Sequence, residues 1–519
     1  MPEYLRALFV ILALATTVFV FAKAPVCALA STTVDFERRR NLWFVITLAA
    51  FLAHNIWIFF IVAALLLLFA IPREPNKLAL FFFLLFAVSP LSEDIPGLGV
   101  VKLIMNFNYF RLLSLTILLP AFLFLKKQQD NDRFGRSLPD KLIVGYLAVI
   151  CILILISSTF THALRAGVIY PFIDVFLPYY VASRSLKSLK EFRDVLVSFI
   201  LAGLVLCVIG IFEYMRHWLL YSGLSGALGV TSRVGMYLER GDGVLRAQAT
   251  AGHAIALGYI IAVAIGFFIY LKRSVPNKTA WSLGLLLMVL GLFSPLSRGP
   301  WVGAAVILLV FVATSPSPGR LFMQLGGFVV VIVPVLLLTS EGEKLVQLLP
   351  FVGSVSDETI TYRQRLLEVT IQVILQKPFF GAYNYMYSPE LEDLRQGHGI
   401  IDIVNSYIGV ALSSGLVGLS LFSGFFMAIA AGIFKAMRSL PDRSSELYPL
   451  GQVLLSTLLG IMIIIFTVSS IFAIPVIYWA VAGLGVAYAR MIALAKTAEN
   501  LSETASPSLA QPASINRRK

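Results

Sequence analysis

Arginines beside long apolar runs are the residues of this sequence best suited to chemistry. Arg246 precedes one such run, Arg298 stands between two others, and Arg363 and Arg365 lie in a polar segment further along the chain. The guanidinium is planar and permanently charged, so it can bind two phosphate oxygens at once and stabilise the charge on a departing diphosphate. These arginines predict a site for a substrate that carries its own diphosphate leaving group.

The stretch "QGHGIIDIVNSYIGVALSSGLVGL" adds His398, Asp402 and Asn405 to the start of an apolar run. An imidazole near neutral pH can accept a proton from a hydroxyl, and Asp402 would orient the ring if the two residues lay one helical turn apart. His398 is therefore the candidate proton acceptor, with Asp402 and Asn405 in support. His253 is a second, weaker candidate.

Plainer explanations exist for each of these residues. The arginines at 363–365 could pair with Glu358 or Glu368 on a solvated helix face, and the other two could anchor helix ends at a membrane surface. The histidines could simply be tolerated at such a surface. Asp174, an acid inside an apolar run, could mark a proton or substrate pathway, or could cap a helix that the neighbouring prolines break.

Sequence motifs for nucleotide, zinc-protease or serine-hydrolase chemistry are absent. The three cysteines, Cys27, Cys151 and Cys207, have no metal-binding spacing. We therefore expect neither a zinc site nor a disulfide framework, and no other metal or cofactor.

The composition is that of a membrane protein. The chain has 519 residues, of which 58% are hydrophobic and 13% charged, whereas soluble domains have about 45–50% and about 25%. Apolar runs near the roughly 20 residues that cross a bilayer recur along the chain, which favours one polytopic domain over residues 1–495. The net charge of +13 reflects basic loops beside membrane helices rather than a nucleic-acid surface.

We expect an all-α fold with roughly 12–14 membrane-spanning helices. The first run resembles a signal peptide, but the many later spans favour an uncleaved helix. Gly415 and Gly418 are predicted to let their helix pack closely against a neighbour. The candidate spans are 5–22, 42–71, 78–93, 108–125, 142–160, 168–183, 194–215, 254–271, 279–296, 300–314, 321–339, 404–434, 450–470 and 473–490.

Basic connectors indicate the topology. They include "KKQQDNDRFGRSLPDK", "SRSLKSLKEFR" and "KAMRSLPDR". If each lies in the cytoplasm, an even number of spans separates successive connectors from about residue 72 onward, as the positive-inside rule requires. The stretch "FERRR" at 36–40 would lie outside if 42–71 is one helix, and inside if that run folds back at His54-Asn55.

The same topology leaves two larger segments on the side opposite the cytoplasm, 216–253 and 340–403, which contain most of the candidate residues. Within the second we expect a helix over about 359–376 that Pro378 ends. The tail, 496–519, is rich in Ser, Ala, Pro and Gln. It is expected to be a disordered cytoplasmic end.

Three pieces of this sequence resemble motifs of the O-antigen ligase and polymerase superfamily of bacterial envelope proteins, over about residues 190–490. "RAQATAGHAIALGY" keeps the family's arginine, threonine and histidine, although Ala254 and Ile255 stand where Pro and Asn are usual. "LSRGPWVG" is close to the family's Ser-Arg-Gly pattern. "RQRLLEVTIQVILQKPFFGA", with the stretch after it, is similar to the last motif and puts Arg363 on the family arginine.

One departure from the family pattern matters most, and it concerns the candidate proton acceptor. The family's His-Asn pair aligns with Val404-Asn405, so the family histidine is missing there. His398 lies six residues earlier. It can replace the missing histidine only if the backbone between them brings the imidazole back to the same place.

The resemblance implies a membrane glycosyltransferase of the GT-C type in the bacterial inner membrane, with its active site facing the periplasm. Such an enzyme would transfer a glycan from undecaprenyl diphosphate without a metal or a nucleotide sugar. Arg246, Arg298 and Arg363, with Arg365 beside them, would hold the diphosphate. Arg363 and His398 would be the catalytic residues, and His398 would assist the acceptor hydroxyl.

The preferred reaction is polymerisation of an exopolysaccharide or O-antigen. Ligation of the glycan to lipid A core is the alternative, and nothing in the motifs separates the two. A polysaccharide transporter or flippase and a non-catalytic scaffold are further alternatives. The expected partners are the lipid-linked donor, the glycan or lipid A core acceptor, membrane lipids and other polysaccharide assembly proteins, without nucleic acid.

Overall fold

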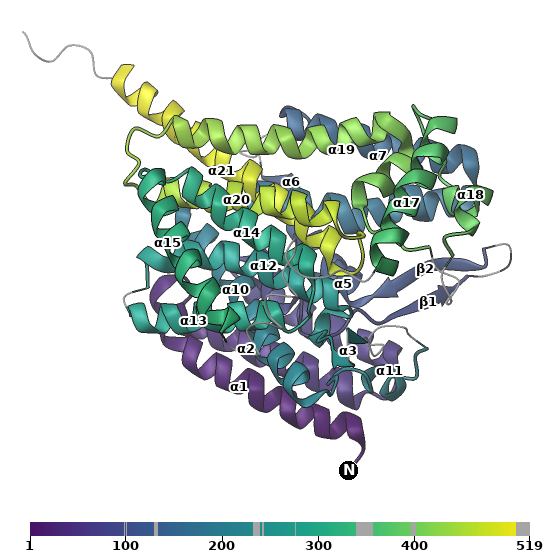
Figure 1. The fold of residues 1–519 in the computed structure, drawn as a ribbon, viewed down its shortest axis with the longest axis horizontal. Coiled ribbons are helices and arrows are strands. Elements are labelled where there is room, and N and C mark those ends of the chain that lie inside the picture. Colours follow the sequence, from purple (N-terminus) through teal and green to yellow (C-terminus); the bar gives the residue numbers. More distant parts are fainter. Residues whose placement is uncertain are drawn as a thin grey trace, which may run out of the picture.

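Helices make up most of this structure (Figure 1). The computed structural model describes residues 1–97, 99, 101–128, 133–231, 239–240, 243–275, 277–338, 357–395 and 401–504. It is 76% helical, and the strands of the described residues form two small hairpins, β1–β2 and β3–β4. Nine of the described helical segments are long and apolar enough to cross a membrane. The predicted all-α polytopic fold is therefore confirmed, and the chain is a multi-pass membrane protein.

The helices and strands of the described residues have the following bounds. The nine long apolar segments are Glu3–Leu29 (α1), Ile56–Arg73 (beginning with α3, Ile56–Ala70), Tyr109–Lys127 (α5, Tyr109–Leu113, to α6, Leu119–Lys127), Leu138–Ser157 (α7), Phe160–Ser185 (ending with α9, Leu177–Ser185), Leu189–Arg216 (α10), Ser406–Arg438 (α19), Leu447–Phe466 (α20) and Ala473–Thr497 (in α21, Ala473–Thr504). Three shorter apolar helices are α12 (Ala254–Tyr270), α13 (Lys278–Phe293) and α14 (Arg298–Ala313). The other elements discussed are α2 (Thr33–Leu52), α4 (Lys77–Leu84), α15 (Pro318–Leu337), α17 (Asp357–Gln376), α18 (Pro389–Glu392), β1 (Ser92–Pro96), β2 (Leu103–Asn108), β3 (Glu239–Arg240) and β4 (Val244–Leu245).

Polar side chains fix where many of these helices begin. Asn55, Asn76 and Asn405 accept hydrogen bonds from the first backbone N–H groups of α3, α4 and α19. Ser188 and Glu191 form a capping box at the start of α10. Each cap satisfies donors that a helix start leaves free, so a polar residue sets the boundary inside an otherwise apolar sequence.

The run 42–71 folds back on itself, which decides between the two topologies left open by the sequence. α2 ends at Leu52 and α3 begins at Ile56. His54 has a φ of +53°, and Asn55 caps the next helix through a 2.9 Å bond from the N–H of Trp57. The predicted span 42–71 is therefore two helices joined by a tight turn.

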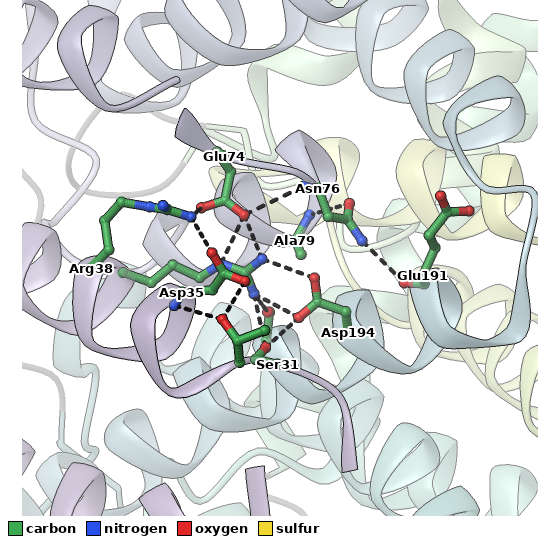
Figure 2. Close-up of polar contacts among 11 residues, drawn as sticks. Ser31, Asp35, Arg38, Glu74, Asn76, Ala79, Glu191 and Asp194 are labelled. Atoms are coloured by element: carbon green, nitrogen blue, oxygen red, sulfur yellow. Dashed lines mark hydrogen bonds and ion pairs between the residues drawn. The ribbon is translucent and has the colours of Figure 1, made fainter. Parts of the chain in front are cut away.

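A buried ion network holds these first helices to α10 (Figure 2). Arg39 of α2 is 2% exposed, with Nη2 2.5 Å from Oε1 of Glu74 and Nη1 2.7 Å from Oδ1 of Asp194. Ser31 donates a 2.5 Å hydrogen bond to the same Asp194 carboxylate. Residues 36–40 therefore lie beside the start of α10, as the folded-back topology requires.

The bundle has two different ends (Figure 1). β1, β2, α17 and α18 gather at one end, which we call the hairpin end. α19 and α21 finish at the opposite end, where a cavity also brings together residues of the basic connectors that follow α6 and α9. We call this opposite end the basic end.

The last helix is longer than expected. α21 continues to Thr504, so the first part of the predicted disordered tail is helical. No proline or glycine occurs between Gly485 and Pro507 to end the helix earlier. Residues 505–519 lie outside the described part of the chain.

Candidate functional site

A buried carboxylate holds the loop that precedes α12. Glu213, near the end of α10, is 0% exposed. It accepts three backbone hydrogen bonds, from Leu220 at 3.0 Å, Gln248 at 2.9 Å and Ala249 at 2.8 Å. A carboxylate buried away from water requires such donors. Glu213 thereby fixes the backbone directly after Arg246.

Arg246 and His253 lie on either side of this fixed backbone. The Nε of Arg246 donates to the carbonyl oxygen of Pro295 at 3.1 Å. The Nδ1 of His253 accepts the N–H of Ile255 at 3.2 Å, so the neutral ring carries its proton on Nε2. Burial and then the positive charge of Arg246 lower the pKa of His253 to about 4, although Asp402 acts to raise it. At neutral pH, His253 is therefore an uncharged hydrogen-bond donor.

The stretch "LSRGPWVG" places Arg298 at the first residue of α14. A side-chain carbon on Gly299 would meet the hydroxyl of Thr467, and one on Gly303 would meet Ile464 of α20. These two glycines let α14 and α20 approach closely and so fix the position of the helix end. The glycines of this motif thus let the two helices pack closely and hold Arg298 at the start of α14, before its apolar part.

Arg363 and Arg298 are neighbours although they come from different helices. Arg363 is exposed on α17, and no residue that the structure describes hydrogen-bonds or ion-pairs with its side chain. Burial and then the positive charge of Arg363 lower the pKa of Arg298. The predicted helix near 359–376 is confirmed as α17, which ends before Pro378.

Arg365 has a different environment on the same helix. Its Nη2 lies 3.3 Å from Oδ2 of Asp393, and the two side chains are 56% and 76% exposed. An exposed pair of this kind contributes little to stability, about 0–1 kcal/mol. The contact matches the plainer explanation for Arg365, except that Asp393 takes the place of Glu358 or Glu368.

The segment before α19 is not helical over residues 401–405. The expected orientation of the His398 ring by Asp402 stays a prediction. His398 itself lies outside the described residues. Asp402 accepts a 2.7 Å hydrogen bond from Ser469, and its carbonyl accepts one from Tyr362 at 3.1 Å.

Asn405, the residue that matches the family pattern, is the N-cap of α19. Its Oδ1 accepts the N–H groups of Tyr407 at 2.9 Å and Ile408 at 3.2 Å. A capping asparagine satisfies donors that would otherwise be free. Asn405 thus fixes the start of α19 next to the Asp402 backbone.

α19 breaks at Gly415, and the loop after α17 fills the break. Gly415 has φ +64° and ψ −167°, a conformation that glycine adopts readily. The N–H of Leu416 donates to the carbonyl of Pro378 at 2.8 Å, and the N–H of Ala382 donates to the carbonyl of Leu412 at 2.8 Å. These backbone bonds dock α17, and with it the candidate arginine, onto α19.

The predicted close packing of α19 is only partly right. At Gly415 the close neighbour is the backbone of Phe379 and Phe380 in that loop rather than another helix. At Gly418 the nearest atoms belong to Ser414 of the same helix, so the prediction of a neighbouring helix is wrong there. The glycine of the Pro-(x)2-Gly motif, Gly381, has φ +61° and packs against the broken backbone of α19.

Asp174 has a structural partner. Nη2 of Arg111 lies 2.8 Å from its Oδ2, and the Arg111 guanidinium carbon lies 3.7 Å from the centre of the Tyr170 ring. The acid stands in a π-helical turn, Phe172–Phe176. This ion pair accounts for an acid in an apolar run without a substrate pathway.

Four separate parts of the chain therefore meet at one site: the loop before α12, the start of α14, α17 and the segment before α19. Arg246 hydrogen-bonds to the turn before α14, Arg298 lies near Arg363, and the charge of Asp402 acts to raise the pKa of His253. Within the described ranges, no group of three or more His, Cys, Asp or Glu residues could hold a metal ion. Sequence reasoning missed Glu213, although the rule that singles out an acid inside an apolar run applies to it as well.

Comparison with known proteins gives one family match. Residues 283–423 match the family model described as O-Antigen ligase. That range contains Arg298, Arg363, Asp402 and Asn405, and it does not extend to the loop before α12. No curated protein matches the chain. The match supports the resemblance stated from the motifs over that range: residues 283–423 of this multi-pass membrane protein are similar to the O-antigen ligase family.

Proposed function

We propose that this protein is a membrane glycosyltransferase that moves an oligosaccharide from undecaprenyl diphosphate to the growing end of an acceptor glycan. The observation that carries the proposal is the nearness of Arg298 and Arg363. Like charges held near one another oppose folding, and a bound anion removes that cost. A diphosphate carries the charge and the oxygen geometry that two guanidiniums bind best.

In the proposed reaction, the acceptor hydroxyl oxygen bonds to the anomeric carbon of the donor sugar, and the bond from that carbon to the diphosphate oxygen breaks. Arg246, Arg298 and Arg363 stabilise the negative charge that stays on the diphosphate. The hydroxyl proton goes to His398 in our proposal. His253, with its proton on Nε2 and its lowered pKa, donates a hydrogen bond to a substrate oxygen.

The proposed setting follows from the loop charges. The positive-inside rule puts the basic end in the cytoplasm, and the hairpin end then faces the periplasm of a bacterium whose inner membrane holds the protein. The arginines supply the charge that a metal would otherwise supply, so we propose that transfer needs no metal and no other cofactor. Asn405 supports the site from the start of α19, and Arg365, which pairs with Asp393, is left outside the proposed diphosphate contacts.

Polymerase is our first choice and ligase the alternative. The two differ in the acceptor, which is a second lipid-linked glycan for a polymerase and lipid A core for a ligase. The deciding experiment is analysis of lipid-linked and finished glycans in a strain that lacks this protein. Loss of long chains with single repeats still displayed supports a polymerase, loss of all surface glycan with long lipid-linked chains accumulating supports a ligase, and unchanged glycans contradict both.

A transporter or flippase remains a second candidate because α19 is broken at Gly415, and broken helices line the substrate sites of many transporters. Hydrogen bonds to the loop after α17 satisfy the backbone groups that this break leaves free. This favours a role of the break in docking that loop. Reconstituted protein that moves a lipid-linked glycan across a bilayer and leaves every glycosidic bond unchanged would establish the transporter. New glycosidic bonds would exclude it as the sole activity.

A further inference from the structure

A cavity at the basic end lies far along the bundle from the candidate site and has a lining of two kinds. Its volume is about 320 Å³, at the lower limit of pockets that hold small molecules. One part of the lining is cationic and comes from the connectors and from α21: Arg133, Arg136, Arg184 and Arg490. The other part is apolar and lies on α19 and α21, where it combines the larger side chains of Ile429, Val486 and Leu494 with the small residues Ala428, Gly432, Ala489 and Ala493.

The cationic part keeps charge available for a ligand. Arg184 is 4% exposed and lies 2.6 Å from Asp140, so this buried pair is already neutral and forms the wall of the cavity. Arg133 and Arg136 are exposed, and no described carboxylate forms an ion pair with either side chain. Asp140 is the one carboxylate among the lining residues that the structure describes.

We propose that this cavity binds the headgroup of an anionic phospholipid, with the phosphate on Arg133 and Arg136 and the start of an acyl chain along α19 and α21. The two-part lining matches an amphiphile, because a free phosphate would leave the apolar part unused. The positive-inside rule puts this end in the cytoplasmic leaflet, where anionic lipids are concentrated and basic pockets between helices bind their headgroups. The inference does not depend on the proposed glycosyl transfer.

The test uses the full-length protein, purified in detergent and stripped of lipid, with bound lipid counted by native mass spectrometry. The probes are phosphatidylglycerol and phosphatidylcholine with identical acyl chains. We expect tighter binding of phosphatidylglycerol, and about thirtyfold weaker binding in the double variant Arg133→Gln with Arg136→Gln, since each arginine near an anionic headgroup contributes about 1 kcal/mol. The matched control, Lys126→Gln with Lys127→Gln, removes the same charge at the end of α6 outside the cavity lining and should bind as the wild type does.

A third variant tests the apolar part. Ala493→Leu fills the exposed rim of the groove on α21 and should weaken phosphatidylglycerol binding while the arginines remain. Equal affinity for the two lipids, or an equal loss in both double variants, would overturn the proposal. Displacement of bound phosphatidylglycerol by millimolar inorganic phosphate, with no effect of Ala493→Leu, would also overturn it, because the site would then be one for free anions.

Discussion

The two ends of the bundle use arginine in opposite ways. At the basic end, Arg39 lies between Glu74 and Asp194 in a buried network. At the hairpin end, Arg298 lies near a second arginine, Arg363. The carboxylates of Glu74 and Asp194 neutralise Arg39, and these ion pairs hold the three segments together. Two like charges repel each other, and their nearness supports our proposal of an anion-binding site.

This comparison separates structural arginines from functional ones better than burial alone does. Arg365 and Arg363 stand on the same helix and are both exposed, yet Arg365 forms an ion pair with Asp393 whereas the charge of Arg363 acts on another arginine, Arg298. The charge of the neighbouring side chain therefore distinguishes Arg365 from Arg363. Variants at the basic end should lose stability, and variants at the hairpin end should lose transfer activity.

The largest expected effect is on stability, at the basic end. Arg39→Ala removes the ion pair of the buried Asp194 carboxylate, although Glu74 keeps Arg38 as a partner, and should lower the free energy of unfolding by about 3–5 kcal/mol. Thermal unfolding of the purified protein in detergent measures it. Arg40→Ala, one residue along with only its neighbour Asn41 as a hydrogen-bond partner, should change stability by about 0.5 kcal/mol or less. Equal unfolding temperatures for the two variants would show that the network does not stabilise the contact between the first helices and α10.

Arg363→Lys should nearly abolish transfer at the hairpin end. Lysine keeps the charge but cannot bind two oxygens at once, and loss of one such donor lowers turnover about 10²–10³-fold. The measurement is the yield of finished glycan in a deletion strain complemented with each variant at equal protein levels. Arg365→Lys is the matched control and should stay near wild type. Near wild-type yield from Arg363→Lys would remove this arginine from the site.

Glu213→Gln should weaken the hairpin end without removing any candidate contact to substrate. The amide puts a donor where the carboxylate accepts backbone N–H groups of the loop after Arg246, at a cost of about 1–3 kcal/mol. We expect roughly a tenfold fall in transfer and faster protease cleavage within 217–253. A variant with normal transfer and normal protease resistance would show that Glu213 does not position this loop.

The smallest expected effect is a pH dependence of stability from His253. Its pKa is about 4 in the folded protein and about 6.5 when unfolded, so below pH 6.5 the unfolded state takes up a proton that the folded state does not. Stability should therefore fall as the pH drops from about 6.5 towards 4. His253→Asn keeps a capping side chain that does not titrate, and it should reduce the difference in unfolding temperature between pH 7 and pH 5. An unchanged difference would assign the acid sensitivity to other groups.

The sequence was sufficient for the class of fold, and its motifs drew attention to two arginines whose charges interact in the structure. Hydropathy and loop charge predict the bundle because the bilayer demands long apolar helices. The "LSRGPWVG" motif and the helix near 359–376 predict Arg298 and Arg363, since both stand at fixed distances from a helix boundary. The sequence left two alternatives for the run 42–71, and the fold-back at His54-Asn55 was one of them.

The remaining features depend on contacts between distant segments. Residues 401–405 follow a non-helical path in which Ser469 hydrogen-bonds to Asp402 and Ile403. The break at Gly415 exists because the loop after α17 supplies hydrogen bonds that the helix loses, and sequence spacing cannot show such a partner. The role of Glu213 likewise rests on backbone donors more than 30 residues away.

The central claim is that neighbouring arginines at the hairpin end bind a diphosphate. Its most direct test is the affinity of the reconstituted protein for undecaprenyl diphosphate and for undecaprenyl monophosphate, measured for the wild type, Arg363→Lys and Arg365→Lys. We predict that the wild type and Arg365→Lys prefer the diphosphate, and that Arg363→Lys loses this preference. Equal preference in all three proteins would contradict the claim.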